Sequence, residues 1–241
     1  MKVYRDFKNG YSLKHIFSLL VFFCFFCLRN IPAAEVPLEK IIYDISPIGY
    51  SDYQDFGLVP FSGSKANLVI FKTSVAGFDD TERIYSHAVS GLPLKVERDV
   101  SMWFHKENIV EDYSPSDNKV EITKFESGKE TEKHIFKSDS GPINNGVLLP
   151  FSLRKVPNLK IGWSTEIRLP EKFTVKLVSK EEIEVPAGKF KTLYFTSTPH
   201  KFDIWISDDD LRLPVKIRGD GVFSYTLSMK ERITESKKEN N

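Results

Sequence analysis

The sequence predicts an all-β domain built on one strongly curved antiparallel sheet of about ten strands. Apolar residues recur at every second position far more often than at helical spacing. Helical segments of 10–15 residues do not alternate with the strand candidates, which disfavours a parallel α/β sheet. Several strand candidates carry large apolar side chains on both faces, and such strands need cover on both sides.

Residues 1–34 are expected to be a signal peptide rather than part of the fold. The opening is net basic, and residues 16–28, IFSLLVFFCFFCL, carry no charge. These thirteen residues would span about 20 Å as a helix, short of the roughly 30 Å hydrocarbon core of a bilayer. That length is typical of a secretory signal, with cleavage expected near Ala33 or Ala34. Retention as an N-terminal anchor in the inner membrane is the alternative.

Cysteine usage and charge indicate the compartment and limit the partners. Cys24 and Cys27 both lie in the uncharged run, so the exported remainder would hold no disulfide. A domain of this kind suits a bacterial periplasm better than a eukaryotic secreted module. The chain has 34 Lys and Arg against 33 Asp and Glu, a formal net charge of +1. This balance argues against nucleic-acid binding through bulk electrostatics.

We expect residues 35–233 to form a single β domain and residues 234–241 to be a disordered, charged tail. Residues 120–136 predict a hairpin of polar strands with its turn at Gly128. Gly, Pro, Asn or Asp mark most joints between strands, as short antiparallel connections require. The other strand candidates are residues 39–45, 66–73, 83–90, 94–104, 109–113, 165–169, 173–179, 190–197, 202–206, 214–218 and 222–233.

Residues 94–104 show the two-residue period clearly. Val96, Val100 and Phe104 fall on one side of the strand, and Arg98 is the polar residue among them. Since successive side chains of a strand point to opposite faces, this pattern predicts one apolar face interrupted by a single charge.

Residues 144–157 break the strand pattern. An apolar cluster surrounds Pro150, which is tolerated in the first turn of a helix and breaks a helix deeper in. We expect a short helix that begins near Pro150 and is entered by an apolar loop; an irregular loop is the alternative. In either form the segment is apolar enough to pack against another part of the chain.

Residues 68–71, 193–195 and 204–206 place large apolar side chains on both faces. A two-sheet sandwich, a filled barrel or a strongly curved open sheet around a lined cavity would each cover them. An ordinary packed interior and a hydrophobic groove, partly covered by the segment around Phe151, both remain open. For a groove, the expected ligand-binding residues are Phe151, Trp163, Phe173, Tyr194, Phe202 and Trp205.

The C-terminal third resembles a known family. Residues 183–192, IEVPAGKFKT, and residues 204–217, IWISDDDLRLPVKI, are similar to the signature of family 3108 of domains of unknown function. Those exported bacterial proteins are similar in fold to the lipoprotein-carrier half-barrels. The resemblance implies a long antiparallel sheet curled around a helix-covered concave face, which in related half-barrels accommodates acyl chains. It implies no catalytic residues.

The sequence shows no established catalytic or metal-binding pattern. It lacks a closely spaced His pair, a G-x-S-x-G elbow, a Walker A loop and a G-x-G-x-x-G run. Residues 207–210, SDDD, join two strands, and we interpret them as a turn whose short acceptors bond their own backbone. A Ca²⁺ site there is the lesser alternative. We therefore expect no catalytic residue, metal ligand or cofactor, and no enzyme.

Three functional hypotheses remain. The first is an exported envelope protein that binds or carries a hydrophobic ligand, such as a lipid or an acylated protein, in a concave groove. The second is a structural or partner-binding periplasmic protein without a small ligand. The third is a hydrolase, which would need buried His and acidic side chains converging in one cleft. Membrane contact is expected only through an uncleaved N-terminal segment; the sequence determines neither the ligand nor the oligomeric state.

Overall fold

One antiparallel sheet of fourteen strands dominates residues 37–220 and 224–234, the part of the chain that the computed structural model describes. The strand order is β8-β7-β6-β5-β4-β3-β2-β1-β14-β13-β12-β11-β10-β9. The predicted all-β class is confirmed, with fourteen strands in place of about ten. The expected signal peptide lies outside the described residues, as does the expected tail apart from Thr234. In the described part, no helix has the length and hydropathy of a transmembrane span.

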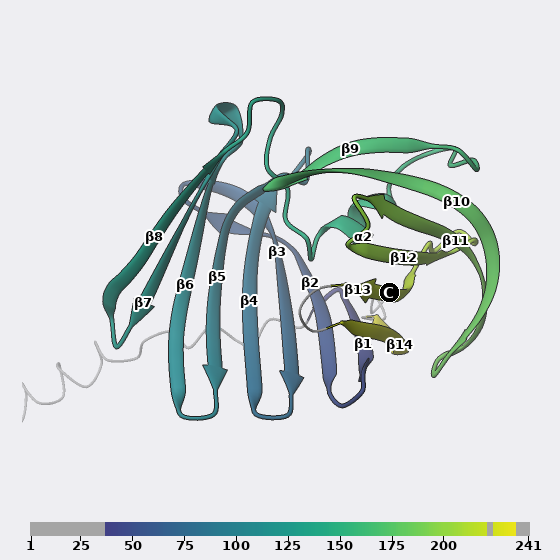
Figure 1. The fold of residues 1–241 in the computed structure, drawn as a ribbon, viewed down its shortest axis with the longest axis horizontal. Helices are drawn as coiled ribbons and strands as arrows, with labels where there is room; N and C mark the ends of the chain where they lie inside the picture. The colour runs from purple at the N-terminus through teal and green to yellow at the C-terminus, as the bar shows by residue number, and fades with distance from the viewer. Residues whose placement is uncertain (1–36, 221–223, 235–241) are drawn as a thin grey trace, which may run out of the picture. The chain divides into compact units, whose positions relative to one another are not determined.

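The chain builds the sheet as two meanders, joined by a segment that contains the short helix α2 (Leu149–Leu153) (Figure 1). The first meander consists of β1 (Glu39–Ser46), β2 (Tyr50–Phe61), β3 (Ser64–Val75), β4 (Phe78–His87), β5 (Pro93–Met102), β6 (His105–Ser114), the 3₁₀ turn η1 (Pro115–Asp117), β7 (Lys119–Glu126) and β8 (Lys129–Lys137). The second consists of β9 (Ser164–Leu169), β10 (Glu171–Val185), β11 (Gly188–Thr198), β12 (Phe202–Ser207), β13 (Pro214–Gly219) and β14 (Tyr225–Thr234).

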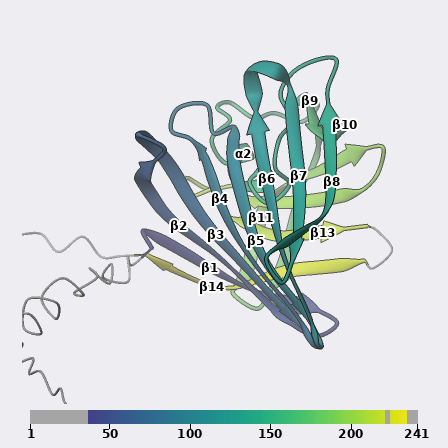
Figure 2. The same ribbon diagram turned by 90° about the vertical axis from the view of Figure 1, so that its left-hand side faces the viewer.

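The two meanders meet where the last strand, β14, pairs with the first, β1. The strands β8 and β9 therefore form the two edges of one open sheet. In Figures 1 and 2 the strands of the second meander run at a steep angle to those of the first, so the sheet is strongly curved. This is the open, curved sheet that the sequence predicts.

The polar hairpin is also confirmed. The strands β7 and β8 are joined by Ser127 and Gly128, whose φ angles are 49° and 77°. Positive φ at both central residues is the geometry of a type I′ turn, which matches the twist of the strands that it connects.

The strand β2 is the one that the sequence pattern missed, because Asp, Gly and Pro interrupt its strand-forming residues. Gly57, with φ 67°, lies at a bulge in the pairing with β3, and its N–H donates to Asp55 Oδ1 at 2.8 Å. Pro60 lies beyond the part of β2 that pairs with β1. Pairing with β1 and β3 thus overrides the local preference.

A row of apolar side chains crosses the second meander and continues into the first. Residues paired across an antiparallel sheet lie on the same face. The register places six residues opposite one another on successive strands: Leu177, Phe195, Ile204, Ile217, Leu227 and Ile45. We call the face that carries this row, and against which α2 packs, the inner face.

The helix α2 packs against both meanders on the inner face. Phe151 belongs to an apolar cluster that includes residues from β1 to β5, and its ring stacks on Tyr53 with centroids 3.5 Å apart. Leu149 and Leu153 belong to a second cluster, drawn from β9 to β12. The expected short helix near Pro150 is confirmed, and its apolar side chains bridge the two clusters.

The segment around α2 is held at both ends by polar contacts. Before the helix, Asn145 Oδ1 accepts the backbone N–H of Leu148 at 3.2 Å. After it, Arg154 Nη1 donates to Glu39 at 2.7 Å, and Arg232 Nε donates to the same carboxylate at 2.7 Å. Burial by itself raises the pKa of Glu39, but the two arginines outweigh burial and hold the pKa below its usual value. Glu39 thus ties α2 to β1 and β14.

Burial on both faces is confirmed for the second meander. Ile204 and Ile206 join the cluster beneath α2, whereas Trp205 points to the opposite face and is only 8% exposed. The end of the long β10–β11 hairpin lies against β14, where Ala187 N–H donates to the Met229 carbonyl at 3.0 Å. The curl of this hairpin brings apolar side chains to the second face.

Residues 68–71 in β3 behave differently from the prediction. Val69 is buried and Phe71 packs against the core, but Leu68 and Ile70, on the opposite face, remain partly exposed. The second face of the first meander has no equivalent of the curled β10–β11 hairpin among the described residues.

We expect Phe151→Ala to lower the free energy of unfolding by about 3–5 kcal/mol, because it removes the buried ring that docks α2 on β2. Phe104→Ala is the matched control: that ring is fully exposed, so the change should stay within about 0.5 kcal/mol. Urea unfolding of both variants measures the difference, and equal losses would contradict the assigned role of Phe151.

Candidate ligand-binding cavity

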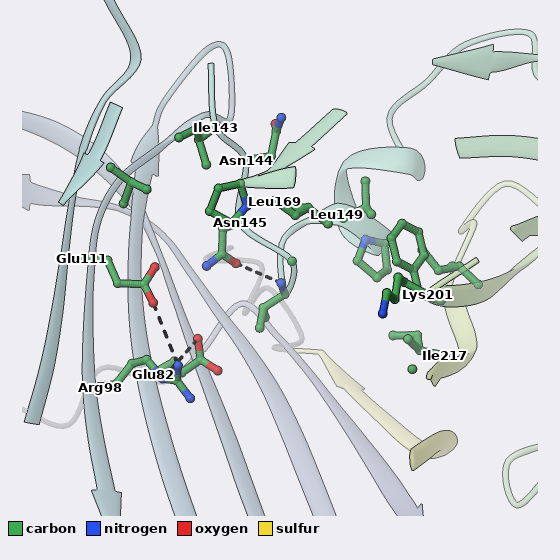
Figure 3. Close-up of a pocket in the computed structure, with 18 of the residues that line it drawn as sticks. Glu82, Arg98, Glu111, Ile143, Asn144, Asn145, Leu149, Leu169, Lys201 and Ile217 are labelled. Carbon is green, nitrogen blue, oxygen red and sulfur yellow. Dashed lines mark hydrogen bonds and ion pairs between the residues drawn. The ribbon is translucent and has the colours of Figure 1, made fainter. Parts of the chain in front are cut away.

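A cavity of about 470 Å³ opens on the inner face between the two meanders (Figure 3). Its walls come from β4 to β7, from the loop before α2, from the β9–β10 turn and from β12 to β14. The volume falls within the range of roughly 300–1,000 Å³ that is usual for small-molecule sites. The cavity is therefore large enough for a ligand.

One wall is apolar. Leu149 reaches it from α2, Leu169 from β9, and Phe202 and Ile217 from β12 and β13. Phe202 is itself supported by Phe173, whose ring centroid lies 5.8 Å away. This wall offers carbon surface against which hydrocarbon can be buried.

A charged group lies on the inner face of β4, β5 and β6, and we call Asp80, Glu82, Arg98 and Glu111 the Arg98 cluster. Glu82 and Arg98 are directly opposite in the register. Arg98 donates to Asp80 through Nη2, and its Nε lies 3.5 Å from Asp80 Oδ1. One carboxylate oxygen each of Glu82 and Glu111 lies 4.0 Å from an Arg98 nitrogen, beyond hydrogen-bonding distance (Figure 3).

The cluster is shielded from solvent although three of its four members are acids. The side chains of Asp80, Glu82 and Glu111 are 5%, 14% and 13% exposed. Burial lowers the pKa of Arg98, but the hydrogen bond to Asp80 and the two glutamates outweigh it and raise the pKa above its usual value. Arg98 therefore stays charged.

The Glu82 carboxyl has a raised pKa. Burial raises its pKa to about 7, the charges of Asp80 and Glu111 add to the rise, and Arg98 opposes it. The Glu111 carboxylate accepts a hydrogen bond from the Tyr113 hydroxyl, with 2.6 Å between the hydroxyl oxygen and Oε2. Near neutral pH the Glu82 carboxyl can thus either donate or accept a hydrogen bond inside the cavity.

The expected ligand-binding residues are distributed over several places. Phe202 lines the cavity, and Phe173 packs behind it. Trp163 lines a smaller cavity of about 160 Å³ and meets Phe195 edge to face. The ring of Phe151 stacks on Tyr53 and does not line the larger cavity.

Tyr194 and Trp205 lie on the other face of the sheet. They are paired in the register next to the inner-face pair Phe195 and Ile204, so strand alternation points them away from the cavity. Their rings stack with centroids 4.9 Å apart, and Trp205 Nε1 donates to Glu181 at 3.0 Å. Tyr194 and Trp205 therefore do not line this cavity.

Sequence reasoning missed Glu82 and Glu111 as cavity residues, and singled out Arg98 without assigning it a role. The pattern that could have revealed the cluster is in residues 94–104, where Arg98 occupies a position on the apolar side of the strand. A charge on the buried side of a strand needs partners, and the partners here come from neighbouring strands.

Two groups of polar residues bring possible metal ligands close together. Asp209 Oδ1 accepts from Ser207 Oγ at 2.8 Å and from the N–H groups of Leu211 and Arg212 at 3.0 and 2.9 Å, so the predicted turn chemistry is confirmed. His105, Glu107 and Glu126 bring ligand atoms within 4.8 Å of one another at the ends of β6 and β7. His105 Nε2 lies 3.8 Å from a Glu107 oxygen and 3.7 Å from a Glu126 oxygen.

We expect Arg98→Met to cost about 3 kcal/mol of unfolding free energy near neutral pH, because it leaves three shielded carboxylates without their cation. Arg83→Met, on the same sheet, removes the exposed pair with Asp99 and should cost less than about 1 kcal/mol. Urea unfolding of both variants makes the comparison. Similar small losses would show that the cluster is not electrostatically coupled.

Glu82→Gln should remove part of the pH dependence of stability. The folded protein keeps a proton on Glu82 up to about pH 7, while the unfolded chain releases it near pH 4.5. Wild-type stability should therefore fall as pH rises through that window, by about 3 kcal/mol from this group. The variant should lack this fall and Glu97→Gln should keep it, in urea unfolding at pH 5 and pH 8. Parallel pH profiles would contradict the assignment.

Known proteins resemble this chain in fold and in sequence. The crystal structure of a beta-barrel-like protein of domain of unknown function DUF1849 from Brucella abortus is similar, with a TM-score of 0.49 and 11% identity; the match covers 85% of this chain and 100% of that one. No curated protein matches the chain. Residues 62–230 match the family described as Protein of unknown function (DUF3108). Because this match covers more than half of the chain and confirms the resemblance in the C-terminal third, the chain belongs to that family.

Proposed function

We propose that this protein is an exported envelope protein that binds or carries a ligand with a hydrocarbon part in the inner-face cavity. The observation that carries the proposal is a 470 Å³ cavity with carbon surface on one wall and a shielded charged cluster on another. Small-molecule sites combine a mostly apolar lining with a few converging polar groups, and this cavity has both.

The apolar wall supplies the driving force for binding. Transfer of hydrocarbon from water to such a wall contributes about 25 cal/mol for each Å² of apolar surface buried. The supports of the wall, α2 and Phe173, are themselves held by the core, so the wall is formed before a ligand arrives. A preformed wall saves the free energy of ordering it on binding.

The charged cluster explains why the core does not simply close over this space. Leu149 and Ile217 would fill an ordinary interior, but a carboxylate facing them would lose its water without a replacement. The space beside Glu82 and Glu111 therefore favours water or a ligand with a polar group. The export part of the proposal rests on the uncharged run at residues 16–28.

A second candidate function is partner binding, and the β5–β6 turn favours it. Trp103 and Phe104 are 75% and 102% exposed there, and the backbone N–H of Trp103 donates to the Gly77 carbonyl at 2.9 Å. Exposed aromatic side chains are enriched where proteins meet. A purified protein that carries no hydrophobic molecule would favour this candidate over the first.

The proposed function predicts that the protein, purified as its cell produces it, carries a hydrophobic molecule seen by native mass spectrometry and lipid extraction. It should also bind the fluorescent probe N-phenyl-1-naphthylamine. Gly146→Trp should weaken probe binding at least about tenfold, roughly 1.4 kcal/mol. Gly146 lines the cavity, its φ lies outside the left-handed region, and an added Cβ meets nothing within 4 Å, so a large side chain can be placed at the lining without backbone strain.

Val89→Trp is the control, because it adds the same side chain at a position that is 91% exposed and does not line the cavity. It should bind the probe like the wild type. The proposal fails if no hydrophobic molecule is extracted and no probe binds, or if Gly146→Trp leaves the affinity unchanged.

A further inference from the structure

The polar end of the cavity carries an excess of negative charge. The Arg98 cluster holds three carboxylates and one guanidinium, and Arg98 already contacts Asp80 through two nitrogens. Glu111 is stabilised by the Tyr113 hydroxyl. Among the described residues no donor lies within hydrogen-bonding distance of the Glu82 carboxylate, although its side chain is only 14% exposed and lines the cavity.

The rest of the cavity does not offset this charge near the cluster. Lys201 lines the opposite side in Figure 3, where it is exposed, and Asp220 lines the same cavity. The lining nearest Glu82 and Glu111 is otherwise apolar or neutral, with Val120 and Ile122 on β7 and Asn145 before α2. A ligand group that reaches the cluster thus meets an excess of negative charge, since the one guanidinium there is already engaged by Asp80.

This charge distribution separates head groups by sign. A carboxylate or phosphate placed beside Glu82 and Glu111 would face like charges in a site largely removed from water, where screening is weak. A hydroxyl can donate one hydrogen bond to Glu82. An ammonium can donate up to three and also offsets the excess charge.

Resting on the proposed function, we infer that the cavity selects amphipathic ligands whose head group is a cationic amine. The ammonium contacts Glu82 and Glu111, and the hydrocarbon part lies along Leu149, Phe202 and Ile217. Arg98, which also lines the cavity, is engaged by Asp80 and offsets one of the three negative charges.

Three probes that share a ten-carbon chain test this inference: decylamine, decanol and decanoate. Each is added to the purified protein at pH 8, where Glu82 is ionised, and its affinity is read from displacement of N-phenyl-1-naphthylamine. Decylamine should bind at least about tenfold more tightly than decanoate, with decanol between them.

The double variant Glu82→Gln/Glu111→Gln leaves Arg98 paired with Asp80 and makes the cluster neutral. The preference for decylamine over decanoate should shrink to within about threefold, while decanol binds as it does to the wild type. Glu97→Gln is the matched control: its carboxylate, on the other face of β5, pairs with Lys95, and the preference should stay intact. Glu82→Gln alone should lose part of the preference, so the test survives if the double variant fails to fold.

The outcomes separate the two proposals. If decanoate binds as tightly as decylamine, or if the double variant keeps the full preference, the inference on the head group is overturned while the cavity remains a hydrophobic site. If none of the three probes displaces the dye, the inference fails, while the proposed function stands or falls by the extraction and by the effect of Gly146→Trp on dye binding.

Discussion

The pairing of β1 with β14 is the interaction on which the rest of the structure depends. It joins the two ends of the described fold over eight paired positions and makes one sheet of two meanders. Tyr43, fully buried on β1, adds a hydrogen bond from its hydroxyl to the Pro214 carbonyl at 2.9 Å. Because this pairing fixes the angle between the meanders, it also creates the space that α2 and the cavity share. The arginine contacts to Glu39 stabilise the same junction from outside the apolar core.

The Arg98 cluster is a departure from the rules that shape the remainder of the inner face. The cluster lies on the same face as Ile84, Val96 and Ile109, which are all buried and apolar. Apolar residues in place of the cluster would therefore have extended the core. A shielded ion cluster is often less stabilising than well-packed apolar residues of similar volume. Departures of this kind concentrate at functional sites, and this one lies in the larger cavity described. Stability and binding therefore depend on different parts of the same face.

The two meanders differ in how far their second faces are covered. In the second meander the long β10–β11 hairpin folds back to β14 and covers Trp205, so both faces are buried. In the first meander the second face is only partly covered, with Leu68 and Ile70 partly exposed, and the strand β8 at its edge is exposed along its whole length. Charged side chains on that edge, such as Lys133 paired with Glu121, discourage further strand addition. The first meander thus presents the charged wall of the cavity, while the second presents most of the apolar wall.

The sequence by itself determined the features that depend on residues close along the chain. The two-residue period fixed the all-β class, Ser127-Gly128 fixed a hairpin, and Pro150 marked the start of a short helix. Tertiary structure alone decided which side chains meet, because strand parity assigns a face only once the partners and bulges are known. That is why β2 escaped detection, why Trp205 points away from the cavity, and why Glu82, Arg98 and Glu111 converge from three separate strands.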